Sequence, residues 1–144
     1  MKRYLAIAAI VIAGGMIGVA QAEDTSAVRT GETAAALAPG KDVFAHWCAP
    51  CHAAEPRLAG TMALQVKYEG AIPAALEDRT DLTPEVVAYF VRNGVAWMPP
   101  FRKTEISDAD LAALGAYLSA PLEERGAHAP RLADEMMARK GVQQ

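Results

Sequence analysis

The segment from Phe44 to His52, FAHWCAPCH, constrains this chain more than any other part of its sequence. Its two cysteines are the only ones in the chain, and they are compatible with two redox chemistries. The form WCAPC is typical of a dithiol that cycles with a disulfide, whereas the form CAPCH is the C-x-x-C-H pattern that attaches a c-type haem. The two interpretations predict different folds, so the secondary structure around the motif distinguishes them.

The residues before the motif predict a helix. A dithiol of the thioredoxin type follows a buried strand rich in β-branched residues. Here the preceding residues are GETAAALAPGKDVFAHWC, with an alanine run and a Pro39-Gly40 pair. Gly40, Phe44 and Cys48 recur at every fourth position and therefore share one face of a short helix.

A second helix is predicted between Thr83 and Gly94. The sequence Thr83-Pro84-Glu85 is typical of a helix start, and Asn93-Gly94 is typical of a helix end. The predicted apolar stripe consists of Val86, Val87, Phe90 and Val91.

A third helix is predicted to begin after Ser107, because Asp110 stands three positions later and forms an approximate capping box with it. Pro121 ends this helix, and a shorter one is predicted from about Thr61 to Tyr68. The apolar face of the third helix consists of Leu111, Leu114, Tyr117 and Leu118.

The thioredoxin-like alternative needs further strands, one of them entered through a cis-proline. The best candidate for that proline lies in Met98-Pro99-Pro100-Phe101, but the following RKTEISDADL is too charged for a buried strand. The predicted fold class is therefore all-α. A disulfide oxidoreductase that uses Cys48 and Cys51 stays open as a distant alternative.

A haem would supply the core that this small helical domain lacks. The stretch 40–120 has few large aromatic residues, and a domain of that size is marginally stable on its core alone. Cys48 and Cys51 would hold one haem c covalently, and His52 follows directly with a ring nitrogen for the iron.

Met98 is the candidate for the second axial ligand, because it lies outside any predicted helix and Pro99 and Pro100 stiffen its loop. Met62 is too close in sequence to the attachment segment, Met136 and Met137 lie in a polar tail, and Met1 and Met16 lie in the N-terminal segment. His46 and His128 are predicted to face solvent.

These features resemble the class I cytochromes c over residues 40–118. Gly40 and Phe44 match the N-terminal helix of that family, and Leu114 with Tyr117 matches its C-terminal helix. The resemblance implies three to four short helices wrapped around one covalently attached haem, with two helices crossing where Gly40 lets them approach closely.

The segment Pro56-x-Leu58-x-Gly60 resembles the family's segment after the haem histidine. In that family the proline carbonyl accepts a hydrogen bond from the second ring nitrogen of the histidine. The resemblance therefore implies that Pro56 orients His52 and makes it a stronger donor to iron.

The segment VRNGVAWMPPF, residues 91–101, is similar to the methionine-ligand segment of the small cytochrome subunits of flavin-dependent 4-alkylphenol hydroxylases, such as p-cresol methylhydroxylase and eugenol hydroxylase. This resemblance implies an electron carrier rather than an enzyme, with a flavin- or quinone-dependent dehydrogenase as donor and a respiratory acceptor downstream. Related loops occur in cytochromes that serve quinoprotein alcohol dehydrogenases, so a freely diffusing carrier for such an enzyme or for a terminal oxidase is the alternative. A haem enzyme such as a peroxidase would require Met98 to be absent from the iron.

Partner docking is expected where the haem edge approaches solvent, near Cys48, Ala49, Pro50 and the Met98 loop. Arg102 and Lys103 beside that loop are candidates to pair with haem propionates or with acids of a partner, and equally to be solvated charges.

The N-terminus predicts export. Lys2 and Arg3 precede an apolar run, and Ala20-Gln21-Ala22 has small residues where signal peptidase cleaves. An uncleaved membrane anchor is disfavoured because the run is short for a spanning helix. The expected location is therefore the periplasm, without stable membrane insertion after cleavage.

The predicted organisation is a signal peptide 1–22, an N-terminal lead segment 23–39, a cytochrome c domain 40–120 and a C-terminal tail 121–144. The tail is predicted either to be disordered or to dock as a short helix from about Leu132 to Lys140. The formal net charge of −3, with no basic cluster, argues against nucleic acid as a partner.

Overall fold

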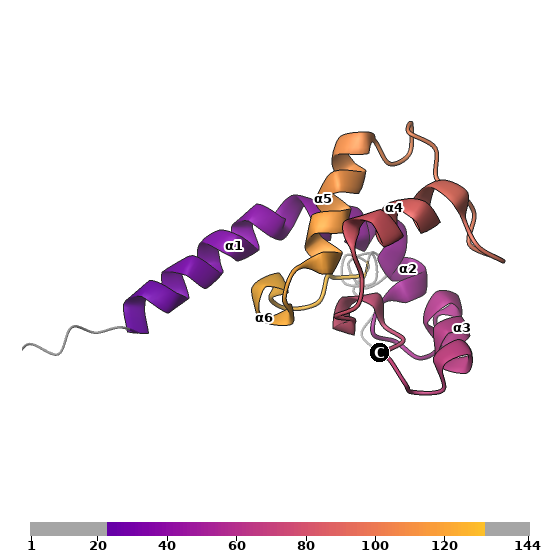
Figure 1. The fold of residues 1–144 in the computed structure, drawn as a ribbon, viewed down its shortest axis with the longest axis horizontal. Helices are drawn as coiled ribbons and strands as arrows, with labels where there is room; N and C mark the ends of the chain where they lie inside the picture. The colour runs from indigo at the N-terminus through magenta and orange to yellow at the C-terminus, as the bar shows by residue number, and fades with distance from the viewer. Residues whose placement is uncertain (1–22, 132–144) are drawn as a thin grey trace, which may run out of the picture.

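The computed structural model describes residues 23–131, and the regular elements within them are helical. No strand occurs in this part of the chain beyond an isolated pairing of Val95 with Met98. The prediction of an all-α fold is therefore confirmed. The elements are α1 Glu23–Val43, the π-helical turn η1 Phe44–Cys48, α2 Ala49–His52, α3 Ala59–Tyr68, the 3-10 turn η2 Leu76–Asp78, α4 Pro84–Asn93, α5 Asp108–Ser119 and α6 Leu122–Arg125 (Figure 1).

Several sequence predictions lie outside the described residues. They are the signal peptide 1–22, the possible helix from Leu132 to Lys140, and the two methionines Met136 and Met137.

Helices α4 and α5 begin where their capping residues predict. The Thr83 hydroxyl accepts a hydrogen bond from the Val86 N–H at 3.3 Å, and Gly94 ends α4 with a φ of 67°. At α5 the Ser107 hydroxyl accepts from the Asp110 N–H at 3.1 Å, while the Asp110 carboxylate accepts from the Ser107 N–H at 3.3 Å. The predicted capping box is therefore confirmed.

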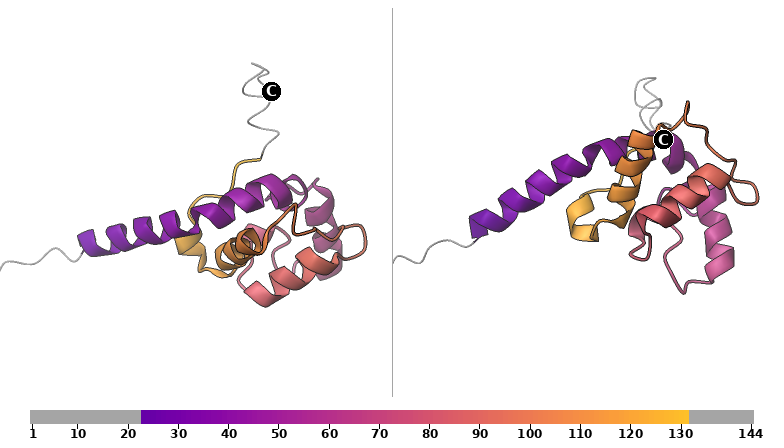
Figure 2. Two further views of the ribbon diagram at one scale, coloured as in Figure 1. Left: turned by 90° about the horizontal axis from the view of Figure 1, so that it is seen from above. Right: turned by 45° about the horizontal axis from the view of Figure 1, so that its top comes forward.

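Helix α1 is longer than the short helix predicted around Gly40. It begins at Glu23, within the segment predicted as a lead, and continues through Pro39 to Val43. Pro39 removes one backbone hydrogen bond from the helix, but the alanine-rich residues before it have the highest helix propensity. Figure 2 shows the N-terminal part of α1 extending away from the other helices.

The core forms where α1 and η1 cross α5. A Cβ atom built on Gly40 would lie 2.1 Å from the Ala113 carbonyl oxygen and 2.7 Å from the Tyr117 Cβ, so only glycine permits this approach. The rings of Phe44 and Tyr117 pack with centroids 6.1 Å apart. The largest fully buried side chains are Tyr117, Phe44, Ile106 and Leu114. The close glycine contact implied by the family resemblance is thus present.

The predicted apolar stripe of α4 divides into two faces. Val87 and Val91, four positions apart, are buried in the core that contains α5. Val86 and Phe90, also four positions apart, are 38% and 37% exposed. Positions four apart share one helix face and neighbouring positions do not. Helix α4 therefore has a second apolar face that the described residues leave partly exposed.

The first part of the predicted tail docks on the turn η2. Glu77 is buried, and its Oε1 atom accepts hydrogen bonds from the Tyr117 hydroxyl at 2.5 Å and from the Ala129 N–H at 2.8 Å. The buried Arg125 donates from Nε to the Ala120 carbonyl at 2.7 Å and from Nη1 to the Glu77 carbonyl at 3.0 Å. These bonds join α5, η2 and α6, so the described residues after Pro121 are an integral part of the domain.

Replacing Arg125 with alanine should lower the free energy of unfolding by about 3 kcal/mol, because the Glu77 and Ala120 carbonyls lose a charged donor and the buried Glu77 carboxylate loses a nearby cation. Urea denaturation followed by circular dichroism measures this change. The exposed Arg57 is the matched control, since its replacement by alanine should change stability by less than about 0.5 kcal/mol. Equal losses in the two variants would contradict the role given to Arg125.

Candidate functional site

The cysteine motif lies where the chain leaves α1 through a π-helical turn. In η1 the Ala49 N–H bonds to the Phe44 carbonyl, five residues earlier, and this widening places Cys48 in the core while Cys51 is exposed. The sequence patterns did not predict this turn. Short π-helical turns are frequent at functional sites.

The Cys48 thiol does not suit the attacking role in disulfide exchange. Burial, followed by the nearby Cys51 and Glu77, raises the pKa of Cys48 to about 12. A redox-active dithiol needs a cysteine that is a thiolate near neutral pH. Together with the absence of a strand within residues 23–131, this result leaves the thioredoxin-like alternative unsupported.

His52 ends α2, and its ring is held between the motif and the start of α3. A Cβ atom built on Gly60 would lie 2.4 Å from the His52 Cε1 and 2.6 Å from its Nδ1, so the ring packs directly against this glycine. The Thr61 hydroxyl donates to the Ala53 carbonyl at 2.8 Å and closes the intervening loop onto α3. The contacts of Gly60 and Thr61 with the motif were not predicted from sequence.

The His52 ring has the properties of a haem ligand. Burial lowers its pKa, so the imidazole is neutral at neutral pH, as coordination requires. Its Nδ1 atom is buried and has no hydrogen-bond partner among the described residues. Pro56 is exposed. Because His52 Nδ1 has no partner among the described residues, the hydrogen bond from this atom to the Pro56 carbonyl stays a prediction.

Met98 lies in a tight turn after α4, which we call the Met98 turn (residues 95–98). The Val95 N–H bonds to the Met98 carbonyl at 3.0 Å, and the Met98 N–H bonds to the Val95 carbonyl at 2.8 Å. A Cβ atom on Gly94 would lie 2.5 Å from the Met98 carbonyl oxygen, so this glycine provides space as well as a positive φ.

The chain after the turn is also fixed. The Phe101 N–H bonds to the Val91 carbonyl at 2.8 Å, and Arg92 donates to the Phe101 carbonyl at 3.2 Å. The backbone of Met98 is therefore held on both sides by α4, which is what a ligand loop requires.

The other candidate ligands are more exposed. His46 is exposed and packs edge-on against Trp47, with ring centroids 4.7 Å apart. His128 is exposed and lies 2.7 Å from the Asp78 carboxylate. Both histidines face solvent, as predicted. Met62 is 51% exposed on α3, whereas Met98 is half-buried.

Arg102 and Lys103 already have acidic partners in this chain. Arg102 pairs with Glu105 at 3.2 Å, and Lys103 pairs with Asp108 at 2.6 Å. Asp108 also accepts from Arg92 at 3.1 Å. The Lys103 and then the Arg92 hydrogen bond hold the pKa of Asp108 below its usual value.

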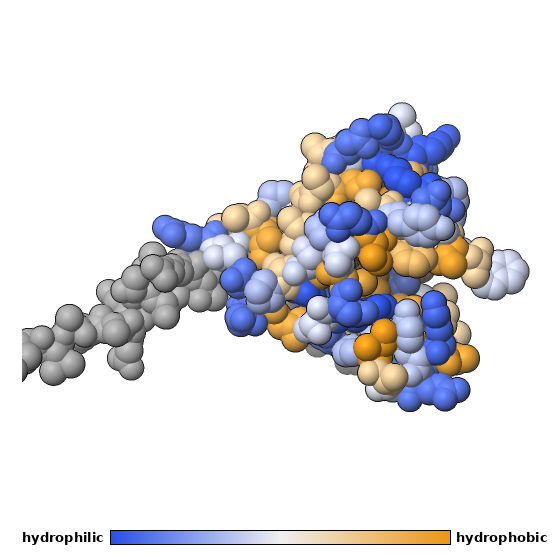
Figure 3. Space-filling model, viewed as in Figure 1, coloured by the Kyte–Doolittle hydropathy of each residue, from blue (hydrophilic) through white to orange (hydrophobic). Residues whose placement is uncertain are grey.

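Apolar side chains around these elements remain uncovered, and this fits a haem. Figure 3 shows apolar side chains at the surface between α4 and α3. A flat apolar macrocycle would cover surface of this kind, which proteins otherwise rarely leave contiguous. The exposed large apolar residues of α3, α4 and the Met98 turn are Met62, Val66, Val86, Tyr89, Phe90, Val95 and Trp97.

Comparison with known proteins identifies the family. The family model described as cytochrome C oxidase, cbb3-type, subunit III matches residues 35–118, which is more than half of the chain. The chain is also 36% identical over 120 residues to a cytochrome c6 from a Picosynechococcus species, covering 83% of this chain and 93% of that protein. This chain belongs to the cytochrome c family. No solved structure matches it.

Family membership confirms the cofactor and the class of activity. Cytochromes c carry one covalently attached haem c, and the Cys48 and Cys51 pair of this cytochrome fits the C-x-x-C-H motif. The protein is an electron-transfer protein rather than an enzyme. Among the helices within residues 23–131, none has the length and apolar character needed to cross a membrane.

Proposed function

We propose that this cytochrome is a periplasmic carrier whose single haem is held by Cys48 and Cys51 and ligated axially by His52 and Met98. The observation that carries this proposal is the position of the His52 ring, which directly follows the two cysteines and packs against Gly60. The periplasmic location rests on the signal peptide predicted at residues 1–22.

The chain's own residues would set the properties of the centre. When bound, haem iron cycles between the ferric and ferrous states and so carries one electron at a time. Gly60 and Thr61 hold the His52 ring in place, and the Pro56 carbonyl would accept its Nδ1 proton. Met98 would offer a neutral thioether, which favours the ferrous state more than a second imidazole does.

The proposed electron donor is a flavin-dependent dehydrogenase that oxidises 4-alkylphenols. The support is the similarity of residues 91–101 to the cytochrome subunits of such enzymes. Oxidation of one substrate molecule releases two electrons, whereas this protein accepts one. The carrier must therefore be reduced, reoxidised and reduced again in each turnover of the dehydrogenase. The respiratory chain would be the final acceptor.

A second candidate is a freely diffusing carrier for a quinoprotein alcohol dehydrogenase or a terminal oxidase. The link to a terminal oxidase is supported by the matching family model, whose description names a subunit of a cbb3-type oxidase. The two candidates share the haem site and differ in the electron donor.

The haem site is tested by the optical spectrum of the protein matured in a periplasm. We expect sharp bands on reduction that survive acid–acetone extraction, because thioethers do not dissociate. A variant with Cys48→Ala and Cys51→Ala should lose all its haem under extraction. Titratable thiols without visible absorption in the unmodified protein would contradict the proposal.

The donor is tested by mixing the ferric protein with a flavin-dependent 4-alkylphenol dehydrogenase from the same organism and a limiting amount of 4-methylphenol. Two molar equivalents of ferrous protein per substrate are expected. Failure of this reduction, with rapid oxidation of the ferrous protein by a cbb3-type oxidase, would favour the second candidate.

A further inference from the structure

Glu77 is the only acidic residue that is buried in the described part of the chain. It lies in the turn η2 and is 3% exposed. Carboxylates are almost never fully buried unless they are paired or hydrogen-bonded, because removing the charge from water costs free energy. A carboxylate kept in the core at this cost is a candidate for a functional role.

The Glu77 carboxylate is hydrogen-bonded but not paired directly with a cation among the described residues. Its Oε1 atom accepts from two neutral donors, the Tyr117 hydroxyl and the Ala129 N–H, which favour the ionised form without cancelling its charge. Its Oε2 atom is buried and has no partner within residues 23–131. The buried cation Arg125 donates to the main-chain carbonyl of Glu77, so it offsets the charge of the carboxylate without binding it.

Buried side chains connect Glu77 to the haem attachment site. The Tyr117 ring, whose hydroxyl donates to Glu77, packs on Phe44 with centroids 6.1 Å apart. Phe44 and Cys48 are the first and last residues of η1, and both belong to the same buried core as Tyr117. The route from Glu77 to Cys48 therefore runs through the protein interior rather than through water.

The Cys48 thiol is affected by the charge of Glu77. After burial and the nearby Cys51, this charge is the third cause of the raised pKa of Cys48. Charges in the interior are screened much less than charges in water, so the effect extends further than that of a surface carboxylate. A haem attached to Cys48 lies in the same electric field.

From these observations we infer that Glu77 lowers the reduction potential of the haem held at Cys48. Ferric haem carries one more positive charge than ferrous haem, so a buried negative charge stabilises the ferric form. Arg125 offsets part of this effect. The inference rests on the proposed attachment at Cys48 and Cys51, and it does not depend on which dehydrogenase donates the electron.

The other charged groups beside this network are closer to water. Asp78 and His128 lie 2.7 Å apart, with side chains 44% and 48% exposed. Lys41 of α1 donates to the Ala127 carbonyl, in an exposed contact. Solvent screens these groups, so Glu77 and Arg125 are the charges of this region that we expect to act on the haem.

The test measures the ratio of ferrous to ferric protein by its optical spectrum at a fixed ambient potential set by redox mediators. Glu77→Gln keeps the size of the side chain and removes its charge. The ratio should rise about tenfold, which corresponds to about 59 mV for one electron. A loosened core would admit water and favour the more highly charged ferric form, so structural damage would change the ratio in the opposite direction. The rise should change less than about twofold between about 20 and about 500 mM KCl, because salt screens buried charges little.

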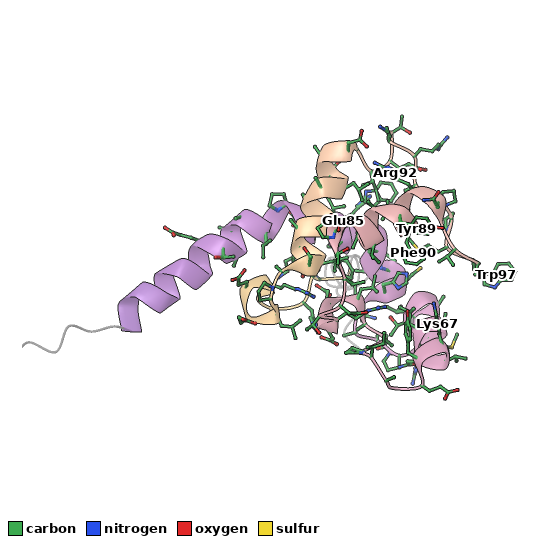
Figure 4. The ribbon with its side chains drawn as sticks, viewed as in Figure 1. Lys67, Glu85, Tyr89, Phe90, Arg92 and Trp97 are labelled. Carbon is green, nitrogen blue, oxygen red and sulfur yellow. The ribbon has the colours of Figure 1, made fainter. Side chains whose placement is uncertain are left out.

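Glu85→Gln is the matched control, because it makes the same change of charge at an exposed residue in the first turn of α4 (Figure 4). It should change the ratio less than about twofold, since water screens this position. Arg125→Gln removes the offsetting cation and should lower the ratio at least about threefold. Arg125→Lys keeps the positive charge and should stay within about twofold of the wild type.

Several results would overturn the inference. One is a ratio in Glu77→Gln that is unchanged, lowered, or raised no more than in Glu85→Gln. If Glu77→Gln does not retain haem, the two Arg125 variants decide, and equal ratios in them would exclude an effect of charge. A wild type without covalent haem would overturn the proposed haem site and this inference together, whereas normal haem with an unshifted ratio would overturn this inference alone.

Discussion

Replacing Met98 with alanine should open a coordination position on the iron without releasing the haem. Cys48, Cys51 and His52 still hold the cofactor, so the variant should retain covalent haem and most of its stability. The ferrous form should bind carbon monoxide readily and the ferric form cyanide, and electron delivery from the dehydrogenase should slow much more than folding is perturbed. Absorption spectra with added carbon monoxide measure the change.

Histidine at the same position tests the electronic role of Met98. A second imidazole donates more charge to ferric iron than a thioether does, so Met98→His should lower the reduction potential markedly if the new ring reaches the iron. Met62→Ala is the matched control, because Met62 is half-exposed on α3 and should have no effect on ligand binding or potential. A Met98→Ala variant that keeps the wild-type potential and excludes carbon monoxide would show that Met98 is not the ligand.

Replacing Gly40 with alanine should destabilise the domain by about 3 kcal/mol, the upper part of the range for overpacked cores. Helix propensity alone predicts the opposite sign, since alanine is favoured over glycine inside a helix by about 1 kcal/mol. The loss arises because the added methyl would lie 2.1 Å from the Ala113 carbonyl oxygen, a backbone atom that cannot rotate away. Helices α1 and α5 must then separate and loosen the packing of Phe44 on Tyr117.

Guanidinium denaturation of the haem-loaded protein measures this effect. Gly70→Ala is the control, because Gly70 has a φ of 85° and an added methyl would meet nothing within 4 Å. It should lose only about 1 kcal/mol of stability through backbone strain. A Gly40→Ala variant as stable as the wild type would mean that α1 and α5 do not cross at the close distance found at Gly40.

Much of this protein follows from short stretches of its sequence. The capping residues Thr83 and Ser107 mark the starts of α4 and α5, and Gly94 marks an end, because helix caps depend on bonds between residues a few positions apart. The CAPCH motif likewise carries its chemistry within five consecutive residues. Met98 is the candidate for the second iron ligand because of its position in the sequence and the two prolines that follow it. Its coordination of the iron remains a proposal.

The length of α1 and the position of the first part of the tail could not be predicted in this way. Local signals at Pro39 and Pro121 favour breaks in the chain, but the helix continues through the first, and residues after the second dock on η2. Packing across the whole domain outweighs the local preference at these two points.

The sequence alone therefore determined the positions of α3, α4 and α5 and the residues of the attachment motif, because those properties depend on near neighbours. Only the tertiary structure decided which apolar faces are covered. Periodicity places Val86 beside Val87 in one stripe, but the packing of α4 on α5 buries Val87 and leaves Val86 38% exposed. Contacts between distant segments also brought Gly60 against the His52 ring and buried Glu77 beneath Ala129, whereas the local turn around Ala96 left Trp97 in solvent.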